Sequence, residues 1–98
     1  MRVRLLKIAE IELDEAIAYY NYEAPGLGEA FLTEVLIALD RISKAPQAWH
    51  RCSQQTRRYQ TRRFPYGIIY QVRKEEILVV AIGHLHRKPE YWMDRVVE

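Results

Sequence analysis

The chain has 98 residues, of which 49% are hydrophobic and 29% charged, so it predicts one globular domain over residues 1–98 and excludes a disordered tail, a repeat array and a membrane span. The formal net charge of +2 conceals an asymmetry, because residues 1–50 carry five Lys/Arg against eight Asp/Glu while residues 51–98 carry ten against five. We therefore expect an acidic helical half and a basic strand half, the second of which would attract an anionic partner.

Residues 3–8 predict a short first strand, after which helical spacing begins. Glu10, Glu12, Asp14 and Glu15 follow the basic, apolar start at once, so the hydrophobic segment of a signal peptide cannot form. We expect these carboxylates to be solvated in a helix start that favours them, and not to form a catalytic pair. The apolar face of this first helix comprises Ile8, Leu13, Ala16, Ile17 and Tyr20, and the helix ends at Pro25-Gly26.

A second helix is predicted over residues 29–43, and Pro46 stops it. Leu32 and Leu36 lie beside its core stripe and widen it. A wide stripe indicates either burial on two sides, which we favour, or a surface left for a partner. The core stripe itself consists of Phe31, Val35, Ala38, Leu39 and Ile42.

The second half predicts a polar connection, three strands and a short helix. Cys52, in the connection 46–56, is the chain's one cysteine, so no disulfide can form within the chain and the cytoplasm is the expected location. Strands are expected over 57–63, 66–73 and 77–84, with Pro65 between the first two, and a helix over 89–96. Ile68, Tyr70 and Val72 would face the helices. The order β-α-α-β-β-β-α predicts an α+β fold, with a helical hairpin packed on a mostly antiparallel sheet.

Four arginines occupy the first of these strands. Alternation would direct Arg57 and Arg63 to one face of it and Arg58 and Arg62 to the other. Guanidinium groups gathered in this way suit an anion, because their planar fork matches phosphate and carboxylate. The other interpretation is an edge strand that uses its charge to resist aggregation.

A second candidate group follows the last strand. His84 and His86 would share a face, followed by Arg87 and then, one helical turn further, Tyr91. We expect no metal and no cofactor, because no third ligand is close in sequence. The histidines suit general acid–base catalysis, whereas Tyr91 does so only if nearby cations lower its pKa. Alternatively, Tyr91 and Trp92 simply pack the last helix on the sheet.

Segments from nearly the whole chain are weak signals alone but specific together. In order they are ELDEAIAYY at 12–20, PGLGEAF at 25–31, RFPYGIIY at 63–70, VAIGH at 80–84 and RKPEYW at 87–92. In these segments the chain resembles the RelE/ParE superfamily of type II toxin–antitoxin toxins. The resemblance implies a β-α-α-β-β-β core, a cytoplasmic bacterial or archaeal toxin, and a cognate antitoxin that folds over the toxin and neutralises it.

The superfamily divides by target. RelE-like toxins cut mRNA in the ribosome with basic side chains on the sheet and a C-terminal tyrosine, whereas ParE-like plasmid-stabilisation toxins lack this set and poison DNA gyrase. Here Gln60, Gly67 and Leu85 stand where a RelE-like chain would place cations, and only Arg58 and Tyr91 match. Losing one such group commonly slows a reaction about a hundredfold or more. The resemblance therefore favours the ParE branch and a toxin that inhibits gyrase by binding, without chemistry of its own.

Two alternatives stay open at this point. One is a ribosome-dependent mRNA endonuclease that uses Arg58, His84, His86, Arg87 and Tyr91. The other is an inactive toxin that serves as an antitoxin-binding module. Operator DNA would be reached only through the antitoxin, and no membrane partner is expected. The surface for target or antitoxin is expected to comprise Arg57, Arg58, Arg62, Arg63, Leu32, Leu36, Arg87 and Trp92.

Overall fold

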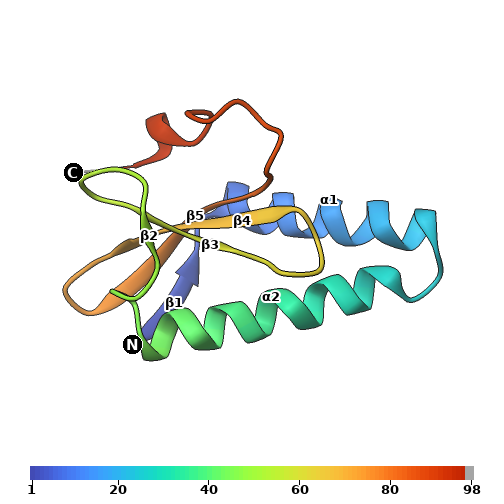
Figure 1. The fold of residues 1–98 in the computed structure, drawn as a ribbon, viewed down its shortest axis with the longest axis horizontal. Helices are drawn as coiled ribbons and strands as arrows, with labels where there is room; N and C mark the ends of the chain where they lie inside the picture. The colour runs from blue at the N-terminus through green and yellow to red at the C-terminus, as the bar shows by residue number, and fades with distance from the viewer. Residues whose placement is uncertain (97–98) are drawn as a thin grey trace.

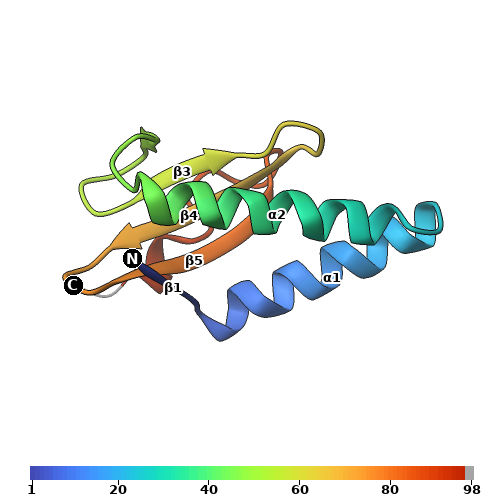
Figure 2. The ribbon, with the colours of Figure 1, turned by 90° about the horizontal axis from the view of Figure 1, so that it is seen from below.

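The computed structural model of the protein describes residues 1–96. A hairpin of two long helices covers one face of a five-stranded sheet, and the segment that follows the last strand crosses the opposite face (Figures 1 and 2). This arrangement confirms the predicted α+β fold. The elements are β1 (Arg2–Leu5), α1 (Lys7–Glu23), α2 (Leu27–Lys44), β2 (His50–Arg51), β3 (Arg57–Gln60), β4 (Tyr66–Val72), β5 (Glu76–His84) and a 3₁₀ turn, η1 (Met93–Arg95).

The strand order in the sheet is β1-β5-β4-β3-β2. The first strand pairs parallel with β5, and the other neighbours are antiparallel. Ile69 is opposite Ala81 while Tyr70 is opposite Val79, so Val80 is an extra residue that makes a bulge in β5. The bulge shifts the alternation of β5, so that side chains on both sides of it still reach the core under the helices.

The core lies between the helical hairpin and the sheet. Ile68, Tyr70 and Val72 of β4 contribute to it as predicted, whereas Ile69 belongs to a smaller cluster on the other face. The helices approach each other closely at Gly28, where a Cβ would lie 2.4 Å from the carbonyl oxygen of Ile17. The remaining fully buried core side chains from the helices are Ala9, Phe31, Val35, Ala38 and Ile42.

Several predicted boundaries differ from the structure. The first strand covers Arg2–Leu5 and not 3–8, because the helix already begins at Lys7. The second helix begins at Leu27 and not at residue 29. In its first turn the N–H of Gly28 donates to Asn21 Oδ1 at 2.8 Å, which satisfies one of the backbone donors that lack a partner within the helix. The two-residue strand β2 was not predicted, since it is too short to show any alternation.

The strand predicted over 57–63 ends at Gln60. Thr61 closes a turn there, because its hydroxyl donates to the carbonyl oxygen of Phe64 at 2.6 Å and its N–H donates to that of Tyr66 at 3.0 Å. Arg62 and Arg63 therefore lie in a turn, and the prediction that they point to opposite faces of a strand is wrong. Their side chains are exposed.

The helix predicted over 89–96 is also wrong in its extent. Only Met93–Arg95 is helical, in a single 3₁₀ turn, and the segment before it bends through bonds such as Tyr91 N–H to the carbonyl oxygen of Lys88. Burial of both sides of α2 is contradicted at Leu36, which is 55% exposed, because the sheet covers only one side of that helix. Within residues 1–96, no helix is long and apolar enough to cross a membrane.

Candidate functional site

The sheet face opposite the helices carries a hollow of about 710 Å³, which we call the outer hollow. It lies over β3, β4 and the end of β5, under the segment that follows β5. Gly67 and Gly83 are opposite each other on β4 and β5 in its lining, and their lack of side chains leaves room for Arg58 and Tyr91. Of the candidate residues named from the sequence, it brings together Arg58, His84, Arg87, Tyr91 and Trp92.

Tyr91 is packed into the wall of the outer hollow. Its hydroxyl occupies the space beside Gly83, where a Cβ would lie 1.9 Å from the oxygen. Arg87 stacks on the ring, with its Cζ 3.8 Å from the centroid. Burial, followed by the negative charge of Glu12, nevertheless raises the pKa of the Tyr91 phenol, and the two neighbouring arginines only partly offset this. The condition under which Tyr91 could act as a general base, a lowered pKa, is therefore not met.

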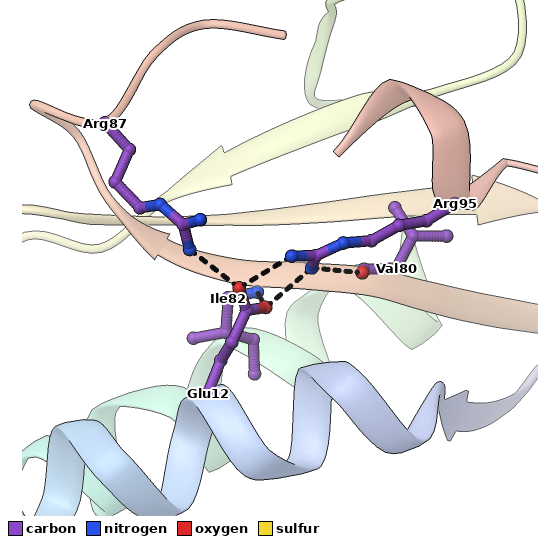
Figure 3. A network of polar contacts seen from close by, with 5 residues as sticks. All are labelled: Glu12, Val80, Ile82, Arg87 and Arg95. Carbon is purple, nitrogen blue, oxygen red and sulfur yellow. Dashed lines mark hydrogen bonds and ion pairs between the residues drawn. The ribbon is translucent and has the colours of Figure 1, made fainter. Parts of the chain in front are cut away.

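Glu12 makes a network that joins α1, β5 and the segment after β5 (Figure 3). Its carboxylate, only 9% exposed, accepts the N–H of Ile82 at 3.0 Å and a bond from Arg87 Nη1 at 2.8 Å. Both terminal nitrogens of Arg95 donate to it, at 2.9 and 3.1 Å, and Arg95 Nη1 also donates to the carbonyl oxygen of Val80. This network stabilises β5 at its edge beyond the end of β1.

The expectation that Glu12 is solvated is therefore wrong, whereas Glu10, Asp14 and Glu15 are exposed as predicted. A buried carboxylate needs compensating donors, and those of Glu12 come from residues 70 to 83 positions away. No pattern close to Glu12 in the sequence signals this, so Glu12 and Arg95 are the residues of the site that the sequence analysis missed.

Arg57 and Arg58 do face opposite sides of the sheet, as predicted. Arg57 donates to the carbonyl oxygen of Trp49 and to Gln47 Oε1, both at 2.8 Å, so it holds the connection before β3. Arg58 lies across the bare backbone of Gly67, whose Cβ, if present, would be 3.1 Å from Arg58 Cδ. Within residues 1–96, no side chain or backbone group forms a hydrogen bond or ion pair with the Arg58 guanidinium.

The two histidines lie at the edge of the site. The N–H of His86 donates to His84 Nδ1 at 3.1 Å, and the two rings are 4.8 Å apart. This bond occupies one nitrogen of His84 as an acceptor, leaving Nε2 for any other contact. His84 lines the outer hollow, whereas His86 is exposed outside that lining. No group of three His, Cys, Asp or Glu side chains in residues 1–96 is arranged to hold a metal ion.

Arg62 and Arg63 lie beside α2, away from the outer hollow. Glu34 of α2 accepts the backbone N–H groups of both arginines, that of Arg63 at 2.8 Å. Leu32 is half-buried and Leu36 exposed on the same helix. The candidate binding residues thus divide between two surfaces: the outer hollow, and the side of α2 next to the β3–β4 turn.

Comparison with known proteins assigns the chain to a family. The family model for the ParE toxin of the type II toxin–antitoxin system parDE matches residues 3–89. No curated protein sequence matches the chain. A solved structure described as the chromosomal ParDE toxin–antitoxin system from P. aeruginosa is similar in fold, with a TM-score of 0.76 and 19% identity over 86% of this chain and 95% of that one. Because the family model covers most of its length, the chain belongs to the ParE toxin family of type II toxin–antitoxin systems.

Proposed function

We propose that this protein is a cytoplasmic toxin that inhibits DNA gyrase by binding to it, and that a cognate antitoxin protein neutralises it. Membership of the ParE family supports the toxin role. The structural neighbour, described as a ParDE toxin–antitoxin system, supports an antitoxin as a partner. The gyrase target is what the resemblance to the ParE branch implies.

The observation that carries this proposal is that the outer hollow offers a single arginine that is not already bound to another part of the protein. Arg87 bonds to Glu12 and stacks on Tyr91, whose phenol has a raised pKa. Of the two arginines that line the outer hollow, only Arg58 has a guanidinium without a hydrogen-bond or ion-pair partner within residues 1–96. Cleavage of a phosphodiester needs several fixed donors at the developing charge, and a single free cation supplies little of that stabilisation. Binding to a protein makes no such demand.

A second candidate function is ribosome-dependent cleavage of mRNA. It is favoured by one observation, that the outer hollow gathers four of the five residues named for that chemistry: Arg58, His84, Arg87 and Tyr91. For this reaction, binding in the ribosome would have to release Arg87 from Glu12 and provide Tyr91 with a lower pKa than it has here.

One experiment separates these functions. The purified toxin, free of antitoxin, is tested for inhibition of gyrase supercoiling and for mRNA cleavage in a translating extract. We expect inhibited supercoiling with intact mRNA, and the same inhibition by Tyr91→Phe, which keeps the ring and its stacking. Codon-associated cuts that vanish in Tyr91→Phe would overturn the gyrase proposal and support the nuclease. A toxin with neither activity would support the role of an antitoxin-binding module.

The antitoxin is proposed to cover both candidate surfaces. An acidic antitoxin would meet Arg62 and Arg63 in the β3–β4 turn and the apolar side chains of Leu32 and Leu36 on α2. Charge reversal at Arg62 and Arg63 should weaken the complex in a titration by calorimetry. An unchanged affinity would remove the turn from the proposed surface. A neighbouring gene that encodes a small acidic protein with a DNA-binding N-terminal part would supply the candidate antitoxin.

A further inference from the structure

Arg58 carries a charge that the protein leaves unneutralised. Within residues 1–96, Arg58 is one of four half-buried arginines. The side chains of the other three bind within the protein. Arg57 bonds to Trp49 and Gln47, Arg73 to Gln71 and Glu76, and Arg95 to Glu12 and Val80. No hydrogen bond or ion pair of this kind is made by Arg58. Arg58 is half-buried as a residue, and its guanidinium is left free to pair with an anion that a ligand brings.

The position of Arg58 allows a ligand to reach it. Its aliphatic stem lies on Gly67, and Gly67 faces Gly83 across the β4–β5 ladder. The Tyr91 hydroxyl covers Gly83 on the other side of the outer hollow. The outer hollow, of about 710 Å³, is lined by these four residues among others. That volume falls within the usual range of ligand sites and holds a few side chains of a peptide.

The rest of the lining indicates what kind of anion fits. Glu90 is the carboxylate in that lining and is exposed, so it opposes a ligand with many negative charges. Arg87 lines the hollow too, but its charge is shared with Glu12. An RNA backbone carries a phosphate at every nucleotide, and only one of these phosphates could pair with the Arg58 guanidinium here. The lining therefore suits a ligand with an isolated negative charge better than it suits RNA. The lining is otherwise largely apolar, and includes Ile69, Leu85, Pro89, Trp92 and Met93.

We propose that the outer hollow binds an acidic peptide segment of a partner protein. One carboxylate of the segment pairs with Arg58 through the two parallel bonds that a guanidinium offers. A neighbouring apolar side chain packs against Trp92 and Met93, the second of which is 48% exposed. This inference rests on the proposal that the toxin acts by binding proteins, and it names the chemistry that one partner must present.

Direct binding of short synthetic probes tests the inference without gyrase or antitoxin. The probe is the capped pentapeptide Asp-Phe-Glu-Leu-Asp. Its controls are Asn-Phe-Gln-Leu-Asn, which lacks the charges, Asp-Gly-Glu-Gly-Asp, which lacks the apolar side chains, and a uridine hexanucleotide. Binding is followed in ¹H–¹⁵N spectra through the amides of Gly67 and Gly83 and the indole of Trp92. We expect the acidic apolar probe to shift these signals, and each control to bind about tenfold or more weakly.

Substitution of Arg58 supplies the decisive comparison. Arg58→Gln breaks no side-chain hydrogen bond or ion pair within residues 1–96, and it should weaken binding of the acidic apolar probe about tenfold. Arg2→Gln removes the same charge from an exposed position in β1 and should change the affinity for that probe less than twofold. Equal affinity for wild type and Arg58→Gln would overturn the inference, as would tighter binding of the hexanucleotide to the same signals. Since the gyrase assay uses none of these probes, failure here and failure of the proposed function are separate results.

Discussion

Glu12→Ala tests whether the network around Glu12 stabilises the fold. The substitution removes the acceptor for Ile82, Arg87 and Arg95. The Arg95 side chain, 12% exposed, would keep the carbonyl oxygen of Val80 as its one hydrogen-bond acceptor within residues 1–96. Removing one partner of a buried ion pair costs about 3–5 kcal/mol, because the other charge stays buried without compensation. A domain of this size is stable by only about 5–15 kcal/mol in total.

The loss should be visible as a fall of roughly 12–40 °C in the melting temperature, since about 4–8 °C corresponds to each kcal/mol in a small domain. Urea titration measures the free energy of unfolding. An unchanged slope of that free energy against urea concentration would show that the substitution does not alter the unfolded state. Asp14→Ala is the matched control, because Asp14 is exposed on the same helix and should change stability by about 0.5 kcal/mol or less.

A double-mutant cycle separates the ion pair from the loss of the side chain. Glu12→Ala, Arg95→Ala and the double variant should give a coupling free energy of about 1–3 kcal/mol. Arg87→Ala should cost less, about 1 kcal/mol, because that side chain is 44% exposed. A cost below about 1 kcal/mol for Glu12→Ala, or a coupling near zero, would refute the claim that this network holds the three segments together.

Three further predictions use other parts of the structure. Burial raises the pKa of Tyr70 to about 12, so the folded state holds the phenol proton more tightly than the unfolded chain does. The free energy of unfolding should therefore fall as pH rises from about 10 toward 12, and urea titrations of Tyr70→Phe should show a smaller fall. Gly83→Ala should destabilise the protein by about 1–3 kcal/mol in the same titration, because the new Cβ meets the Tyr91 hydroxyl, whereas Gly67→Ala should cost less since it meets only a flexible arginine stem; equal costs would contradict the packing of Tyr91. Glu34→Ala should speed hydrogen exchange at the amides of residues 62 and 63, and unchanged exchange there would show that the carboxylate does not hold the turn.

The sequence predicted the helices and the central strands well, because their signals are local. Phe31, Val35 and Ile42 recur at helical spacing, and all three are fully buried. The alternation of Ile68 and Ile69 placed their side chains on the correct faces of β4. Both signals depend only on neighbours within a few positions of the chain.

The features that the sequence did not predict depend on distant contacts or on side-chain geometry. The partners of Glu12 are separated from it by most of the chain. The turn that removes Arg62 from β3 depends on the hydroxyl of Thr61, which a pattern of polar residues does not distinguish from a strand. Within residues 1–96 the Arg58 guanidinium has no partner because of where the fold places its neighbours, which no local pattern indicates.

The pairing of β1 with β5 has a consequence for how the toxin is made. During synthesis Arg2–Leu5 leaves the ribosome well before its partner in the sheet, residues 76–79, which follows only after both helices and three other strands. Contacts of such long sequence separation slow folding, because the chain between them must be ordered first. The pairing of β1 with β5 therefore forms only after the apolar helical hairpin has emerged. An antitoxin that binds the helices would therefore meet them before the sheet of the toxin is complete.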